Sequence, residues 1–67
     1  MHNAALRARL AYYGVTQKKI ADEMGINARV FSNKLHRRKV NGYEACFTET
    51  QKAWLAERLT LDINEIE

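Results

Sequence analysis

The apolar positions along the chain recur at helical spacing. Leu6, Leu10 and Tyr13 are four and three residues apart, and this spacing places them on one face of a helix predicted over residues 4–13. Asn3 directly precedes this helix and is a candidate N-cap, because its side chain can accept a hydrogen bond from a free N–H of the first turn.

Glycines mark where the first two helices are expected to end. Gly14 and Gly25 can each take the left-handed conformation that ends a helix. Between them, Thr16 is a candidate N-cap, and Ile20 and Met24 lie four residues apart on one face. The second helix has only about two turns and would be marginal in isolation, so packing must stabilise it.

A third helix is predicted over about residues 28–36. Asn27 is its candidate N-cap, and Phe31 and Leu35 form its apolar face. Ile26 lies in the preceding turn and is expected to pack into the core. The remaining positions point more outward and are mostly polar: Ala28, Arg29, Ser32, Asn33 and His36.

The next segment contains an Asn-Gly pair. Asn41-Gly42 lies between Val40 and Tyr43, and this arrangement is the strongest short signal for a β-hairpin. A hairpin of this size is marginally stable unless it packs on a larger domain. We therefore expect a tight turn here, with a small two-stranded flap.

A capping box marks the start of a fourth helix. Thr48 and Gln51 can satisfy each other's free backbone donors at the beginning of a helix predicted over residues 49–59. The side chains that this helix is expected to bury are Leu55, Ala56 and Leu59. Trp54 lies off this stripe, and we interpret it as a core residue or as part of an exposed apolar patch for dimerisation.

The last residues predict one further short element. Asp62 starts a second capping-box pattern, followed by a turn that buries Ile63 or Ile66. No repeat, low-complexity tract or linker interrupts the chain, so residues 1–67 are expected to form a single domain. The expected fold class is all-α, a compact bundle of four to five helices with a small hairpin near Asn41-Gly42.

Composition is consistent with a small globular protein. Of the 67 residues, 46% are hydrophobic and 28% are charged, which is typical of a folded domain. Cys46 is the only cysteine, so no intramolecular disulfide can form, which fits a reducing compartment. Arg7 and Arg9 interrupt the apolar residues near the N-terminus, and no apolar run approaches membrane-spanning length. We expect a soluble, cytoplasmic protein.

The positive charge is concentrated in the middle of the chain. The net charge is only +3, but residues 27–43 contain five Lys and Arg and no acidic residue. Residues 44–67 contain two basic and six acidic residues. This asymmetry favours binding of a polyanion to one face, with the acidic end turned away.

The segment TQKKIADEMGINARVFSNKL, residues 16–35, resembles the helix-turn-helix of the phage Cro/repressor-type (XRE-like) DNA-binding family. The matching positions are Gln17, Ile20, Ala21, Met24, Gly25, Ile26 and Phe31. The tail LAERLTLDINEI is similar to the last helices of that family, so the resemblance covers roughly residues 6–66. It implies a bundle of the lambda-repressor-like helix-turn-helix type.

The chain departs from the family pattern at two places. Leu35 lies one residue later than the usual closing apolar position, which Lys34 occupies, so the rotation of the third helix is open. The connection after that helix is long and basic and holds Asn41-Gly42, which raises the prospect of an additional wing-like contact.

The resemblance implies that the third helix enters the major groove of DNA. The residues expected at base edges are Ala28, Arg29 and Asn33, with Asn27 and Ser32 nearby. Their chemistry agrees, because Arg can donate two hydrogen bonds to guanine, Asn can pair with adenine, and Ala can contact a thymine methyl group. Asn27 is also expected to act as a cap, and Asn33 can equally face water.

A second set of residues is expected at DNA phosphates. Gln17 matches the family's phosphate-binding glutamine, at a helix start where free N–H groups favour an anion. The others are basic residues, which supply affinity and salt dependence but little sequence information: Lys18, Lys34, His36, Arg37, Arg38 and Lys39. Outside a DNA-binding fold, such a basic run is usually a solvated face.

These features predict a sequence-specific transcriptional regulator, a phage- or prophage-type repressor that binds a pseudo-palindromic operator in double-stranded DNA. The resemblance implies a homodimer on two half-sites about 34 Å apart. The last helices and Trp54 are the candidate dimer surface. The alternative is a protein-interaction module, antirepressor- or antitoxin-like, whose basic face binds an acidic protein.

Catalysis and metal binding are not expected. Ser32 and His36 share a helix face, and Cys46 could be paired with His36, but neither pair has an orienting third group or a predicted pocket. His2, His36 and Cys46 do not have the spacing of a zinc site. We expect no enzyme activity, no cofactor and no small-molecule ligand.

Overall fold

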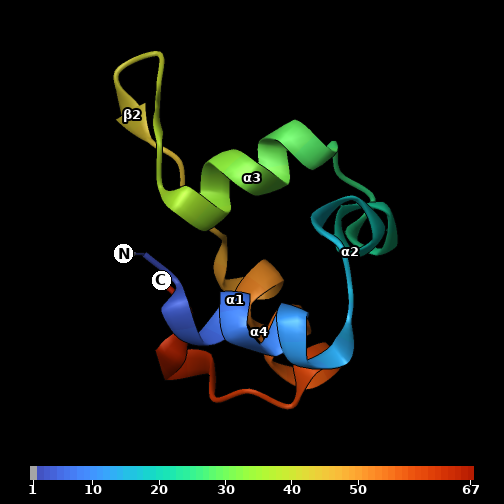
Figure 1. The fold of residues 1–67 in the computed structure, drawn as a ribbon. Coiled ribbons are helices and arrows are strands. Elements are labelled where there is room, and N and C mark those ends of the chain that lie inside the picture. The colour runs from blue at the N-terminus through green and yellow to red at the C-terminus, as the bar shows by residue number, and fades with distance from the viewer. Residues whose placement is uncertain (1) are drawn as a thin grey trace.

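A computed structural model describes residues 2–67 and is built mainly of helices (Figure 1). The chain forms α1 (Ala4–Tyr13), α2 (Gln17–Met24), α3 (Ala28–His36), β1 (Lys39–Val40), β2 (Tyr43–Glu44), α4 (Glu49–Leu59) and the 3-10 turn η1 (Ile63–Glu65). The four predicted helices and the hairpin are therefore confirmed. The chain folds into a small body, from which the hairpin projects beyond the end of α3.

The helix ends follow the local rules. Thr16 Oγ1 accepts a hydrogen bond from the Lys19 N–H at 3.1 Å, and Asn27 Oδ1 accepts one from the Arg29 N–H at 2.7 Å. Gly25 ends α2 with φ of 74°, a conformation that costs little only without a Cβ. These predicted caps are confirmed.

The capping predictions after α3 have mixed outcomes. Thr48 Oγ1 accepts from the Gln51 N–H at 3.1 Å, and Gln51 Oε1 accepts from the Thr48 N–H at 3.0 Å, so this capping box is confirmed. The second predicted capping box is wrong, because Asp62 Oδ1 accepts from the nearer Asn64 N–H at 2.9 Å. The N–H of Glu65 bonds to the Asp62 backbone carbonyl instead, as a 3-10 turn requires.

Asn3 occupies the N-cap position of α1, and its carbonyl accepts the Arg7 N–H at 2.9 Å, but its side chain makes no capping hydrogen bond, so the predicted side-chain cap is wrong. Its backbone is left-handed, with φ of 56°, and its side chain is completely buried. The side-chain amide donates to the Leu35 carbonyl at 2.9 Å, and the side-chain oxygen accepts from the Glu67 N–H at 2.7 Å. Asn3 therefore ties the first residues to α3 and to the last residues, and the two ends lie together in Figure 1.

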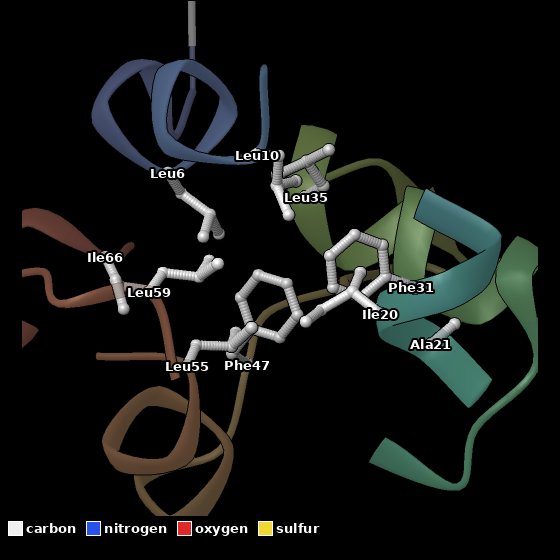
Figure 2. Close-up of a cluster of buried hydrophobic side chains, with 10 residues drawn as sticks. All are labelled: Leu6, Leu10, Ile20, Ala21, Phe31, Leu35, Phe47, Leu55, Leu59 and Ile66. Atoms are coloured by element: carbon white, nitrogen blue, oxygen red, sulfur yellow. The ribbon is translucent and has the colours of Figure 1, made fainter. Parts of the chain in front are cut away.

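One apolar cluster joins all the helices (Figure 2). Its buried members are Leu6, Leu10, Ile20, Ala21, Phe31, Leu35, Phe47, Leu55, Leu59 and Ile66. Phe47 was not predicted from the sequence, and its ring centroid lies 5.5 Å from that of Phe31. Leu35 is fully buried, so the shifted apolar position closes the face of α3.

Other apolar side chains lie at the edge of this cluster or outside it. Trp54, Met24 and Ile26 are partly buried against the core. Tyr13 was predicted on the apolar face of α1 but is 43% exposed. At the end of the chain, Ile66 is buried and Ile63 is exposed, which decides between the two predicted alternatives.

The core fixes α3 from several sides. α2 packs closely against α3 across the short turn, and α1 packs against α4. Ala21 has no exposed surface, and its carbonyl accepts the Ile26 N–H at 3.0 Å, so a small residue lies where the chain turns. Within residues 2–67, no helix has the length and apolar character needed to cross a membrane.

Candidate nucleic-acid interface

The side of α3 that faces away from the core is polar and basic apart from Val30, which is 42% exposed. Phe31 and Leu35 are fully buried, whereas Arg29 is exposed and Ser32 and Asn33 are half-buried. We call Arg29, Ser32 and Asn33 the outer face of α3. All three were predicted to lie at base edges; the helix places Arg29 and Asn33 on the side opposite the core and Ser32 at the flank of the buried face.

Arg38 extends the outer face of α3. Its Nη1 donates to Ser32 Oγ at 3.0 Å and to Asn33 Oδ1 at 3.4 Å. Its backbone N–H bonds to the Asn33 carbonyl at 2.9 Å, which holds the residue directly after the helix. A guanidinium carries five N–H donors, so most of them stay free to bind an anion. Arg38, which was predicted to contact phosphate, is thus brought together with Ser32 and Asn33, which were predicted to lie at base edges.

Arg37 lies against carboxylates instead. Its Nε is 2.7 Å from Glu44 Oε1, and its Nη1 is 3.4 Å from Glu67 Oε1. The Nε–H is not aligned for a hydrogen bond, so the contact with Glu44 is an ion pair. Arg37 was predicted to contact phosphate, but two carboxylates neutralise its charge. Its role is to join the end of α3 to the hairpin and to the last residue.

Two further predicted residues also have partners within the fold. Lys34 Nζ donates to Gln51 Oε1 at 2.8 Å, which directs the ammonium toward the start of α4. Asn27 uses its side-chain oxygen to cap α3, so only its amide nitrogen is free for another contact. Ala28, predicted to contact a thymine methyl group, is half-buried and packs against the core.

The start of α2 supplies a second group of polar residues. Gln17 and Lys18 are exposed in its first turn. Arg7 of α1 lines the same surface hollow as Thr16 and Gln17, and no ion pair involves Arg7 among residues 2–67. Arg7 was missed from the sequence, because only the packing of α1 beside the start of α2 gives it this place.

His36 carries less positive charge at neutral pH than an ordinary histidine, because its pKa is lowered. Partial burial lowers the pKa of its imidazole, and the nearby Arg38 and Arg7 lower that pKa further. The ring is therefore mainly neutral at pH 7 and can offer one N–H donor. Lys39, in contrast, is exposed on the hairpin and has no carboxylate partner among residues 2–67.

Two carboxylates away from the outer face of α3, Glu23 and Glu67, are paired with cations. Glu23 and Arg58 form a two-bond pair at 2.7 and 3.1 Å, which lowers the pKa of Glu23 and raises that of Arg58. The pKa of Glu67 is lowered to about 2 by the Asn3 N–H, by His2 and by Arg37, although partial burial opposes this shift. The acidic groups near the end of α3 thus act on Arg37 and not on Arg38.

Comparison with protein-family models, with curated proteins and with solved structures finds no match for the chain. What the surface can do therefore follows from its own chemistry. The outer face of α3 offers hydrogen-bond donors and acceptors on a fixed helix, together with Arg38. No group of three or more metal-ligating side chains gathers in residues 2–67.

Proposed function

We propose that the protein is a sequence-specific double-stranded DNA-binding transcriptional regulator of the phage Cro/repressor helix-turn-helix type, with α3 as its recognition helix. The observation that carries the proposal is the outer face of α3, joined by Arg38, on a helix whose opposite side is fully buried. A basic, hydrogen-bonding helix face on a rigid body is the arrangement that reads base edges in a major groove.

The dimensions suit a major groove. α3 has 9 residues and is therefore about 13 Å long, and the major groove is about 12 Å wide. α2 and the short turn before α3 would lie across the DNA backbone. The left-handed Gly25 and the buried Ala21 allow the close approach of α2 and α3 that this arrangement needs.

Base reading and backbone binding fall to different residues in the proposal. Arg29 pairs with guanine, and Asn33 with adenine when its contact with Arg38 opens. The long 3.4 Å contact between Arg38 and Asn33 is easily exchanged for a contact with DNA. Arg38, Lys39 and Lys18 neutralise phosphates, and these contacts position the helix.

The start of α2 adds a phosphate contact. The first N–H groups of a helix have no intrahelical partner and favour an anion. Gln17 donates from its amide, and Arg7 brings a charge to the same hollow. Arg37 and Lys34 are excluded from the DNA surface in this proposal, because their charged groups have partners inside the fold.

The proposal includes a homodimer on DNA. The protein measures 32 × 23 × 22 Å, so one copy cannot place recognition helices in two successive major grooves about 34 Å apart. Two adjacent copies can. Such a dimer on a pseudo-palindromic operator would repress by excluding the polymerase from the promoter.

Selection from a random-sequence duplex pool tests the proposal. Recovery of one sequence with two half-sites about one helical turn apart is expected. The affinity for the recovered duplex is then measured against salt concentration, and log affinity should fall linearly with log salt as phosphate contacts release counterions. No enrichment, or binding that is insensitive to salt, would contradict DNA binding. Salt-dependent binding of an acidic protein in its place would favour an interaction module.

A further inference from the structure

The hairpin holds apolar side chains that the core does not use. Tyr43 is 80% exposed and Val40 is 42% exposed, and the two residues are directly paired across the strands. A tyrosine ring in water contributes little to the stability of the fold, because little apolar surface is removed from solvent. The hairpin therefore presents an aromatic ring and a hydroxyl group outward.

The base of the hairpin is fixed. The Ala45 N–H donates to the Arg38 carbonyl at 2.8 Å, which adds a bond below the paired strands. After β2, Phe47 is buried in the core against Phe31. Arg37 forms an ion pair with Glu44 at the end of β2. The tip then projects from the body beyond the end of α3 (Figure 1).

The turn itself is well suited to a two-residue hairpin. Asn41 has φ of 53° and Gly42 has φ of 83°, which match the positive φ values that tight hairpins require at both positions. Side chains alternate between the faces of a strand. Lys39 and Glu44 therefore share the face of the Arg37 contact, and Val40 and Tyr43 share the opposite face.

The cations at the base of the hairpin, Arg38 and Lys39, favour a partner of negative charge. Glu44 is the only acid in β1 and β2, and Arg37, which also meets Glu67, lies 2.7 Å from it. Lys39 and the adjacent Arg38 have no ion pair among residues 2–67. This cationic surface is continuous with the outer face of α3, since Arg38 contacts Ser32 and precedes Lys39.

We propose that the hairpin is a second DNA-contact element, which binds the sugar–phosphate backbone beside the groove that α3 occupies. The proposal rests on the proposed function. Because α3 is about as long as the major groove is wide, its C-terminal end lies at the groove wall, and the hairpin that follows meets the backbone. The Tyr43 hydroxyl donates to a phosphate oxygen and Val40 packs on deoxyribose from the same face of the hairpin, and Arg38, directly before β1, neutralises charge.

The test compares three variants with the wild-type protein, using the duplex recovered by selection. Tyr43→Ala removes the ring and the hydroxyl, and Tyr43→Phe removes only the hydroxyl. Tyr12→Ala is the matched control, since Tyr12 is 75% exposed on α1. Affinity is measured on the full duplex and on a series shortened from the flanks, and hydroxyl-radical footprints are recorded. Thermal unfolding checks that each variant is folded.

On the full duplex, Tyr43→Ala should weaken binding about tenfold, and Tyr43→Phe about threefold to tenfold. The footprint of Tyr43→Ala should lose the protected sugars at the flanks and keep those of the central groove. On the shortest duplex, both variants should match the wild type. Tyr12→Ala should bind as the wild type throughout.

Unchanged affinity and flank protection for Tyr43→Ala would overturn the proposal while DNA binding by α3 stands. Loss of self-association in sedimentation, with flank protection unchanged, would overturn it in favour of a second copy of the chain at the hairpin. If the wild type binds no duplex, the proposed function and this inference both fall. If Arg29→Ala weakens binding and Tyr43→Ala does not, DNA binding by α3 stands and only the hairpin inference falls.

Discussion

The surroundings of Arg37 and of Arg38 differ although the two residues are adjacent in sequence. Arg37 lies between Glu44 and Glu67 and holds the end of α3, the hairpin and the last residue together. Arg38 lies over Ser32 and Asn33 and meets no carboxylate among residues 2–67. A basic run therefore divides into structural and surface charge according to where the acids lie in the fold.

The largest effect is expected when the buried side of α3 is compared with its outer face. Phe31→Ala should destabilise the protein by about 3–5 kcal/mol, because it leaves a cavity beside Phe47 in a small core. Ser32→Ala, its neighbour, should change stability by at most about 0.5 kcal/mol. Denaturant unfolding followed by circular dichroism measures both. Similar losses would mean that α3 does not have one buried and one free side.

The next largest effect is expected when a residue proposed to contact a base is removed from the outer face of α3. Arg29→Ala should weaken binding to the selected duplex by about 1–3 kcal/mol and relax the preference at one base pair. Lys19→Ala, an exposed cation on α2, is the control and should leave the base preference intact. Affinities are compared on the selected duplex and on random duplex. An equal loss of affinity on both duplexes would make Arg29 a phosphate contact.

Replacing each of the two neighbouring arginines should have a different effect, one on the salt dependence of DNA binding and the other on the stability of the fold. Arg38→Ala should reduce the slope of log affinity against log salt by about one and leave stability unchanged. Arg37→Ala should leave the slope unchanged and lower stability by about 1 kcal/mol, because Glu44 and Glu67 lose their shared cation. Salt titration and denaturant unfolding are run on both variants. Interchanged results would show that the ion pairs of Arg37 do not hold in solution.

The smallest effect is expected in the acid range. The pKa of Glu67 is lowered to about 2 from 4.5, so its contribution to stability is present above about pH 4.5. That contribution is lost as pH falls toward 2, because the unfolded chain then binds a proton that the folded carboxylate resists. Glu67→Gln should therefore flatten the fall in stability between these pH values. Unfolding curves measured across that range compare the two proteins, and identical pH profiles would contradict the pairing.

Local rules predicted what depends on near neighbours. Thr16, Asn27 and Thr48 cap their helices because each partner lies two or three residues away. Asn3 was misjudged because its partners lie 32 and 64 residues away, where no local pattern points to them. Phe47 was missed because it lies between elements, outside any helical or strand spacing.

The candidate site shows the same division. Helical spacing placed Arg29, Ser32 and Asn33 outside the core, since it depends only on which face is apolar. It could not distinguish Arg37 from Arg38, because the distinction is made by carboxylates brought in from the hairpin and the last residue. Arg7 needed the packing of α1 beside α2.

The hydrogen bonds between Asn3 and Glu67 have a consequence for the connectivity of the chain. The Asn3 N–H donates to Glu67 Oε2 at 2.8 Å, and the Glu67 N–H donates to Asn3 Oδ1 at 2.7 Å. A short peptide could therefore join Asn3 to Glu67, and the chain could be reopened between Asn41 and Gly42. Such changes are tolerated where the joined ends are adjacent and the reopened loop is exposed. Such a circular permutant would keep every helix in place and carry its free ends on the hairpin, where a label or a second module could be attached.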